Sequence, residues 1–395
     1  MMILSRYSRL LALPHLQAAI IASVIGRLPI GIAGLAILLL VHKATGSFAQ
    51  AGATTASYVL GLAAVAPLLG RLIDRRGPRR ILAACGVMYP AALGALLAAL
   101  AWSAPVWIIL PIAGTAGASL PPITVCMRTF LRRRLGEDPL LATAYSLESV
   151  LIESIFIIGP MLVSTIVAAA SPAWAVAFAG GCASLGTFLF LKAPPLASWH
   201  IEQRRAAMSM FGPLEQRRFL LLLVVILCYS IAFGLVEIGV TAFASEAGAP
   251  ALAGLMLGLM SVGSVCGGLT YGSRGWRLPL SRQFTITLAI MGGGIAPLAM
   301  LASPPLFTAF AVATGLAMAP ALTIQSMLVA RIAIPEHATE AFTWSSTGLL
   351  AGVGIGLAGG GMLLESGTSA AVLAAGAATA LAAALLSKGL LNDLI

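Results

Sequence analysis

The chain has 395 residues, of which 59% are hydrophobic and 9% are charged, and its mean hydropathy is +1.00. Soluble proteins usually carry roughly a quarter charged residues. This composition excludes an ordinary soluble enzyme, because too few polar side chains are present to cover a water-exposed body of this size. The formal net charge is +10, and the distribution of the basic residues decides what that charge means.

Twelve apolar segments are long enough to cross a hydrocarbon layer about 30 Å thick. They lie at 16–41, 49–70, 81–102, 106–130, 140–168, 172–191, 217–243, 249–271, 284–302, 305–330, 340–363 and 369–391. The polar stretch from Lys192 to Arg218 divides them into two sets of six. We therefore expect an all-α membrane protein with twelve transmembrane helices in two pseudo-symmetric halves, 1–192 and 217–395. The stretch 193–216 is expected to be a cytosolic linker with a short amphipathic helix.

The basic residues gather at alternate ends of these segments, which predicts an orientation in the membrane. If the N-terminus is inside, the cytosolic ends receive Arg6, Arg9, Arg71–Arg80, Arg128, Arg132–Arg134, Lys192, Arg274, Arg277, Arg282, Arg331 and Lys388. The opposite side receives only Lys43. Cytosolic loops of membrane proteins carry this excess of Lys and Arg. The pattern predicts a multi-pass inner-membrane protein with both termini cytosolic, in contact with lipid and not with nucleic acid.

An internal repeat supports the division into halves. Leu60-Gly61 with Gly70 recurs at a constant offset as Leu257-Gly258 with Gly267, and Ala144-Tyr145-Ser146 recurs as Ala341-Phe342-Thr343. Helices interrupted by proline also occur in both halves, at Pro121-Pro122 and at Pro320. Repeated halves around a site near the middle of the bilayer are typical of secondary transporters.

The loop between the second and third segments carries the most specific motif of the chain. It reads Gly70-Arg71-Leu72-Ile73-Asp74-Arg75-Arg76-Gly77-Pro78-Arg79-Arg80. Gly70 allows two helices to approach closely, Asp74 can cap a helix N-terminus, and Gly77 permits a tight turn.

This loop resembles the loop signature of the major facilitator superfamily. In that family the loop latches the two halves together in one state, and the resemblance implies this role for Asp74 and its neighbours Arg75, Arg79 and Arg80. The second half retains only Gly267, Gly268, Tyr271, Arg274 and Arg277 of the motif and lacks the aspartate. We therefore expect an asymmetric latch.

The wider pattern resembles the bacterial branch described as predicted efflux permeases. Gly159-Pro160 is similar to the core of the antiporter signature, although Ile155 replaces an earlier glycine of it. Leu110 stands where drug exporters carry an arginine. Export of a small organic solute coupled to proton entry is the leading expectation, and nutrient uptake by proton symport or facilitated diffusion is the alternative. A transporter-like membrane sensor is the alternative from another class.

No enzymatic activity, metal or cofactor is expected, because the sequence contains no nucleophile–base or metal-ligand constellation. The five cysteines stand singly in apolar runs. A monomer is expected. Its halves should rock around a cavity that exposes the substrate to one side of the membrane at a time.

A few charged residues fall inside the predicted spans, where each costs roughly 2.5–3.5 kcal/mol on insertion scales. Arg27 and Glu153 both lie near the middle of the bilayer, and we expect them to pair. Such a pair either is static or has a role in coupling or substrate binding. Coupling to protons is possible because a neighbouring arginine favours the charged form of a carboxylate and burial favours the neutral form. Glu148 is expected to meet Arg128 or Arg132. Glu237 is expected to face water near the outer surface or to face the cavity.

The remaining candidates lie near the ends of the spans. Arg128 and Arg331 are close enough to the cytosol to reach water with their long side chains. Tyr145, Phe342 and Trp344 begin the fifth and eleventh spans. They are expected to be interfacial anchors, with stacking on the substrate as the alternative.

Overall fold

The computed structural model describes residues 2–193, 212–249 and 252–391, and its regular elements are helices throughout this part of the chain. The first half contains α1 (Met2–Leu11), α2 (Leu16–Thr45), α3 (Phe48–Arg76), α4 (Pro78–Ala101), α5 (Val106–Ala118), α6 (Ile123–Leu135), α7 (Leu140–Ala169) and α8 (Pro172–Lys192). The second half contains η1 (Gly212–Glu215), α10 (Arg217–Glu246), α11 (Leu252–Gly272), α12 (Leu280–Leu298), α13 (Pro304–Gly315), α14 (Met318–Ile332), η2 (Pro335–His337), α15 (Ala338–Ser366) and α16 (Ser369–Leu391). The all-α architecture predicted from the sequence is confirmed.

Eleven spans within the described residues are long and apolar enough to cross a membrane. The helix at the expected ninth position, α12, is less apolar because Ser281, Arg282 and Gln283 occupy its first turn. The fourth and tenth spans are each broken into two helices, α5–α6 and α13–α14. Pro121 and Pro122 separate α5 from α6 because proline has no N–H to continue the helical hydrogen bonds. Pro320 lies in the first turn of α14, where the missing N–H has no helical partner to lose.

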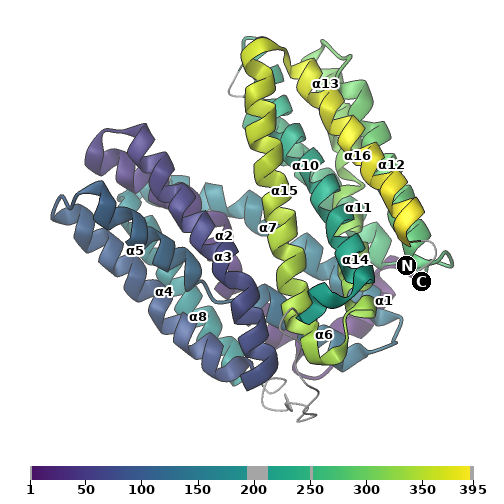
Figure 1. The fold of residues 1–395 in the computed structure, drawn as a ribbon, viewed down its shortest axis with the longest axis horizontal. Coiled ribbons are helices and arrows are strands. Elements are labelled where there is room, and N and C mark those ends of the chain that lie inside the picture. Colours follow the sequence, from purple (N-terminus) through teal and green to yellow (C-terminus); the bar gives the residue numbers. More distant parts are fainter. Residues whose placement is uncertain (1, 194–211, 250–251, 392–395) are drawn as a thin grey trace.

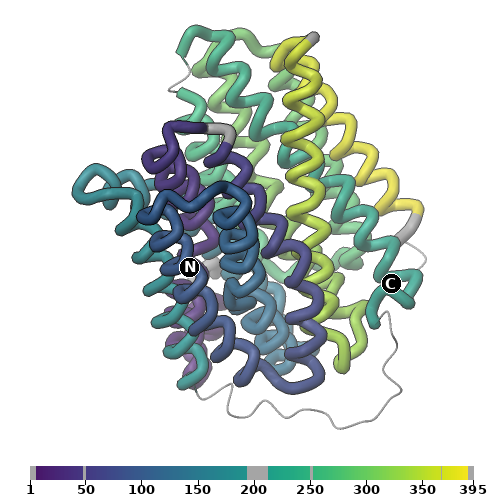
Figure 2. The backbone as a smooth tube through the Cα atoms, turned by 60° about the vertical axis from the view of Figure 1, so that its left-hand side comes forward, coloured from purple at the N-terminus to yellow at the C-terminus, as the bar shows by residue number. Residues whose placement is uncertain are grey.

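The helices form two groups that lie apart at one end and meet at the other (Figure 1). Within the first group α2 packs on α8 and α3 packs on α5; within the second, α10 packs on α15 and α16. Contacts between the groups come mainly from α3 against α15 and from α7 against α11 and α14. Figure 2 shows α3 and α15 converging toward the lower end of the molecule. We call this set of contacts between the halves the seam.

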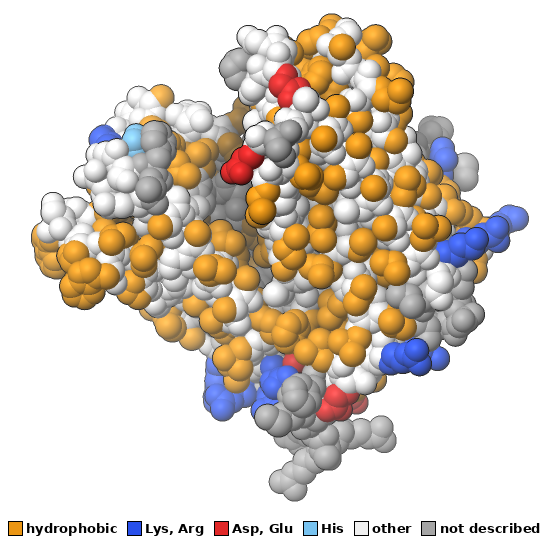
Figure 3. Space-filling view, turned by 45° about the horizontal axis from the view of Figure 1, so that its top comes forward, with side chains coloured by type: hydrophobic (Ala, Val, Ile, Leu, Met, Phe, Trp, Pro, Cys, Tyr) orange, Lys and Arg blue, Asp and Glu red, His pale blue; other side chains and the backbone are white. Residues whose placement is uncertain are grey.

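Most of the arginines mark one end of the bundle, which we call the basic end. It comprises the junction of α3 and α4, the end of α6 and the end of α14, with Arg71–Arg80, Arg132–Arg134 and Arg331. Many Lys and Arg atoms lie along the lower edge in Figure 3, and the surface is hollowed between the two lobes on the other side. The halves thus meet at the basic end and are separated by a hollow toward the opposite end.

The predicted linker 193–216 falls mostly on residues 194–211, which lie outside the described part of the chain. Its helix and the bounds assigned to the halves stay predictions. The predicted cytosolic position of the termini also stays a prediction.

Small residues let the helices of each half approach closely. A Cβ placed on Gly186 of α8 would lie 2.0 Å from the backbone nitrogen of Gly26 in α2. A Cβ on Gly159 of α7 would lie 2.5 Å from the carbonyl oxygen of Gly31, also in α2. In lipid, helices associate through such close packing because apolar side chains gain little by avoiding water. α2 is therefore fixed between α7 and α8.

We expect Gly186→Val to lower the melting temperature of the purified protein in detergent. The added methyl groups meet the backbone of α2, and overpacking of this kind costs roughly 1–3 kcal/mol. Gly181→Val in the same helix is the matched control, because a Cβ at Gly181 meets nothing within 4 Å. Equal melting temperatures for the two variants would contradict this account of the packing.

Candidate functional site

A buried ion pair joins α2 to α7. Arg27 donates from Nη1 to Glu148 Oε2 over 2.6 Å and from Nη2 to Glu148 Oε1 over 3.1 Å. Arg27 also donates from Nε to the Ser23 carbonyl over 3.0 Å and from Nη2 to the Ser23 hydroxyl over 2.7 Å. The two side chains are 0% and 2% exposed. These four hydrogen bonds compensate for the cost of removing the two charges from water.

The expected pairing of Arg27 with Glu153 is wrong, and so is the expected pairing of Glu148 with Arg128 or Arg132. Glu148 and Glu153 are five residues apart on α7, so their side chains point about 140° apart around the helix. The face that carries Glu148 is the one that meets α2. Glu153 is half-buried and interacts with the hydroxyl of Ser264 in α11. It forms no ion pair within the described residues.

Arg128 of α6 is buried, so the expectation that it reaches water is also wrong. It keeps 6% of its surface exposed, and its Nε has no hydrogen-bond partner within the described residues. Arg128 interacts electrostatically with Glu148, which already binds Arg27 with both oxygens. Tyr229 of α10 is another electrostatic neighbour and belongs to the second half. Arg128 is therefore a buried cation near the seam without a carboxylate of its own.

Arg331, by contrast, is exposed at the end of α14, as the sequence predicted. Glu237 of α10 is exposed as well. This exposure agrees with both expectations for Glu237, a position facing water near the outer surface and a position facing the cavity.

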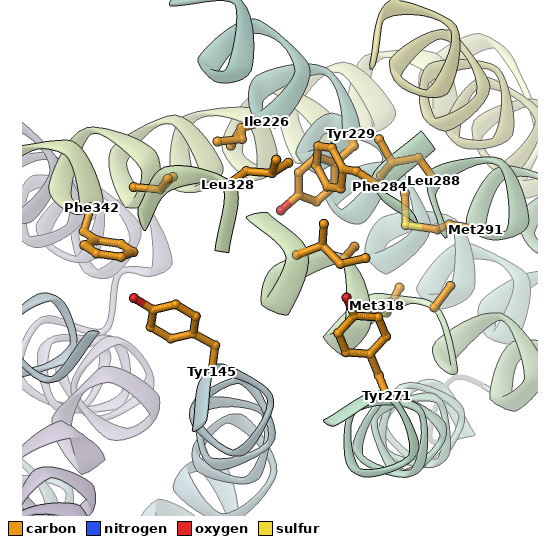
Figure 4. Close-up of a cluster of buried hydrophobic side chains, with 14 of the residues drawn as sticks. Tyr145, Ile226, Tyr229, Tyr271, Phe284, Leu288, Met291, Met318, Leu328 and Phe342 are labelled. Carbon is orange, nitrogen blue, oxygen red and sulfur yellow. The ribbon is translucent and has the colours of Figure 1, made fainter. Parts of the chain in front are cut away.

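Polar and aromatic side chains meet across the seam beside the buried charges of Arg27, Glu148 and Arg128. Thr323 of α14 donates to the hydroxyl of Ser149 in α7 over 3.2 Å. The rings of Tyr145 and Phe342 meet edge to face with their centroids 6.0 Å apart, as Figure 4 shows. Both rings are buried, so their expected role as interfacial anchors is wrong. These contacts join the two halves.

Tyr229 leads into a second polar group within the second half. It donates to Gln325 Oε1 of α14, and Gln325 Nε2 donates to the Ser345 hydroxyl of α15 over 2.6 Å. All three side chains are buried. The network ties α10, α14 and α15 together next to the seam.

The motif that follows α3 binds the opposite half. Asp74 accepts hydrogen bonds from the backbone N–H groups of Thr339 at 3.1 Å and Glu340 at 2.8 Å. These groups belong to the first turn of α15, so the predicted capping by Asp74 is confirmed, with its partner in the other half. Arg71 donates to Glu340 Oε1 over 2.7 Å from Nη2 and 3.1 Å from Nε. We call these contacts the charged latch.

The two glycines of the motif fit their expected places. A Cβ on Gly70 would lie 2.3 Å from the Thr343 hydroxyl and 3.0 Å from Glu340 Cα. Gly77 has φ +78°, a conformation that other residues rarely adopt. Arg75, Arg79 and Arg80 are exposed at the basic end. The arginine that crosses the seam here is Arg71, which the sequence analysis did not single out.

The other side of the seam is joined by neutral groups. Thr143 of α7 donates to the Gly272 carbonyl of α11 over 2.6 Å, and Ser146 donates to the Gly268 carbonyl. Tyr7 of α1 donates to the Leu269 carbonyl over 3.1 Å and contacts Ser146 at 3.2 Å. The two sides of the seam are therefore unequal, as the missing aspartate in the second half predicted.

Three features of the site were not predicted from the sequence. The short helix α1, which packs on α7, carries an amphipathic pattern with Arg6 and Arg9 that could have revealed it. The pair Ser149–Thr323 and the group Tyr229–Gln325 carry no sequence signal, because lone polar residues in an apolar run do not reveal their partners. The described residues contain no group of three or more His, Cys, Asp or Glu side chains that could hold a metal ion.

The sequence matches the family profile of the Major Facilitator Superfamily over residues 19–295. The chain belongs to the major facilitator superfamily. No curated protein matches its sequence significantly.

The fold is similar to that of solved major facilitator transporters. A bacterial homologue of the iron transporter ferroportin, solved in an outward-facing state, has a TM-score of 0.75 at 16% identity, with 96% of this chain and 99% of that chain covered. The Escherichia coli fucose:proton symporter has a TM-score of 0.74 at 13% identity, covering 95% and 99%. The human organic anion transporter MFSD10 has a TM-score of 0.72 at 17% identity, covering 95% and 99%. These likenesses show the fold, and with the family match they make the chain a multi-pass secondary transporter.

For the buried ion pair of this major facilitator protein, we expect the single variants Arg27→Met and Glu148→Leu each to be strongly destabilised. Removing one partner leaves an uncompensated buried charge, which costs about 3–5 kcal/mol. The double variant should recover much of that loss, because neither member of the pair is left charged without the other. Melting temperatures of all three variants in one detergent measure this. Additive losses in the double variant would show that the pair is not coupled.

For the charged latch, we expect Asp74→Ala to loosen the seam at the basic end. Loss of a capping side chain costs about 0.5–2 kcal/mol, and here that loss falls on a contact between halves. A cysteine introduced at the buried Thr343, in a chain whose native cysteines are replaced, should react faster with a maleimide. Asp138→Ala is the control, because Asp138 caps Leu140 within its own half. Unchanged reactivity in Asp74→Ala would argue against a latch.

Proposed function

We propose that this protein exports a small organic solute across the inner membrane in exchange for protons, by alternating access. One observation carries the proposal: the halves are joined through the seam at the basic end and are separated by a hollow toward the other end. Cytosolic faces of membrane proteins carry an excess of Lys and Arg, which favours a cytosolic basic end. In that orientation the hollow opens outward. The similarity to a protein solved in an outward-facing state supports the same reading.

The arrangement favours alternating access because the seam is built from interactions that can be exchanged. The charged latch and the neutral hydroxyl bonds are each worth about 0.5–3 kcal/mol. Opening of the basic end costs these bonds and is offset by new contacts at the outer end. The energy difference between two such states is small enough for a bound solute to shift their populations. Glu148 and Arg27 lie within one half, so the pair can move as a unit.

Glu153 is the carboxylate that best fits proton coupling. It lies about 20 Å along α7 from Leu140, near mid-bilayer and at the contact with Ser264 of the other half. A neutral Glu153 allows that contact to be dry, whereas a charged one requires water or a cation. Proton binding at Glu153 is thus linked to closure of the space between the halves. Nutrient uptake by proton symport uses the same linkage in the opposite direction and stays the alternative.

The substrate favoured by the charges is an organic anion. Arg128 is a buried guanidinium with an unpartnered Nε and an already engaged neighbouring carboxylate. A carboxylate or phosphate on the solute supplies the missing partner through charge-assisted hydrogen bonds. The structurally similar human transporter MFSD10 is described as an organic anion transporter, which agrees with this choice. Neither a resident metal nor a covalent step is required.

We expect Glu153→Gln to abolish accumulation of solute driven by a proton gradient in proteoliposomes, while exchange of labelled for unlabelled solute continues. A glutamine cannot carry the proton, but it leaves the solute path intact. Glu365→Gln, at the exposed far end of α15, is the matched control and should behave like the parent. Intact proton-driven accumulation by Glu153→Gln would overturn the coupling role.

The direction of transport is measured in the same vesicles, by making either the inside or the outside acidic and following the movement of solute. Export by antiport moves solute toward the acidic compartment, because protons leave that compartment in exchange. Symport moves solute away from the acidic compartment together with the protons. Movement away from the acidic compartment would replace the export proposal with the uptake alternative.

A further inference from the structure

A cavity lies between the halves at the basic end. Its volume is about 500 Å³, and both halves line it. From the first half it receives α1, the end of α6 and the turn into α7; from the second it receives the loop between α11 and α12 and the end of α14. Four guanidinium groups line it, those of Arg6, Arg132, Arg274 and Arg331.

No carboxylate within the described residues lies close enough to form an ion pair with these four arginines, although Arg132 interacts electrostatically with Asp74 and Glu336. Arg132 donates from Nη2 to the Ala333 carbonyl over 2.5 Å, while its Nη1 is buried without a partner. The lining also contains Glu137 and Asp138, and Asp138 is engaged in capping Leu140 at 2.8 Å. Four positive against two negative side chains leave the cavity with an excess of positive charge.

The arginines come in pairs from opposite sides of the seam. Arg6 and Arg132 belong to the first half, and Arg274 and Arg331 belong to the second. Arg6 already reaches across, since a Cβ on Gly275 would lie 2.7 Å from its Nη2. Like charges that line one cavity repel each other, and an anion between them would attract all of them. Arginine is the residue best suited to this, because its planar donors match phosphate oxygens in pairs.

We propose that this arginine cavity binds a phosphate group, and that the bound phosphate holds the basic end closed. The phosphate belongs either to the head group of an anionic lipid or to a small soluble phosphate. Since its ligands come from both halves, the site is complete only while the basic end is closed. Binding therefore stabilises the state that is open at the other end, by linkage. This role is independent of which solute the protein transports.

The test uses the full chain, purified and delipidated in detergent. Its melting temperature is measured with inorganic phosphate against chloride at equal ionic strength, and in nanodiscs of phosphatidylglycerol against phosphatidylcholine. We expect phosphate or phosphatidylglycerol to raise the melting temperature. A response to phosphate identifies a soluble ligand, and a response confined to phosphatidylglycerol identifies the lipid head group.

Two double variants with the same change of charge make the test specific. Arg274→Gln with Arg331→Gln removes two cavity arginines and should abolish at least half of the stabilisation. Arg134→Gln with Arg277→Gln removes two exposed arginines of the basic end that do not line the cavity, and it should retain the stabilisation. An equal loss in both variants would reduce the effect to general charge screening and overturn the proposal. Absence of stabilisation in the parent protein would overturn it as well.

A conformational measurement separates a phosphate that bridges the halves from one that binds only one of them. In a chain with its native cysteines replaced, a cysteine at Thr343 reports opening of the seam. Bound phosphate should slow its reaction with a maleimide at least threefold in the parent and leave it unchanged in Arg274→Gln with Arg331→Gln. Stabilisation with an unchanged reaction rate in the parent would contradict the bridging role.

Discussion

Hydrocarbon offers no hydrogen-bonding partner, so each polar side chain placed at membrane depth must find its partner inside the protein. This constraint organises the whole molecule. Within the halves it produces closed arrangements such as Arg27 with Glu148 and Ser23, in which the guanidinium donates four hydrogen bonds. Between the halves it produces the seam, where Asp74 and Thr143 find their partners in the opposite half. Arg27, Glu148 and Ser23 are thus satisfied inside one half, whereas Asp74 and Thr143 are satisfied across the boundary between the halves.

The unequal chemistry of the two sides of the seam follows from the repeat. α3 and α11 are repeat counterparts, and each meets a helix of the opposite half at its basic end. The first copy retains Asp74 and Arg71, which act on the start of α15 by capping and by an ion pair. The second copy presents backbone carbonyls to the hydroxyls of α7. A seam with one charged and one neutral side can open first where the bonds are weaker, and α1 covers that neutral side through Tyr7.

The sequence predicted those parts of the fold that depend on local rules. Hydropathy indicates how many apolar spans the chain has, and proline marks where helices break. The carboxylate of Asp74 is of a type that caps helix N-termini. Partner choice within the membrane did not follow. Depth along the helices suggested Glu153 as the partner of Arg27, but the rotation of α7 about its axis selects Glu148. That rotation is set by the close approach of Gly159 to Gly31, a contact that no single segment reveals. Tyr145 and Phe342 were likewise placed at an interface by their position in the chain, whereas they meet each other across the seam.

We propose that the two halves move against each other, closing at one end as they open at the other. This movement is tested most directly by two spin-label distances measured in the same lipid preparation, with and without transported solute. One pair, at Gly52 of α3 and Glu365 of α15, spans the end away from the basic residues, and the other, at Arg76 and Glu336, spans the basic end. We expect bound solute to shorten the first distance and to lengthen the second. Two distances that stay fixed, or that change in the same direction, would contradict it.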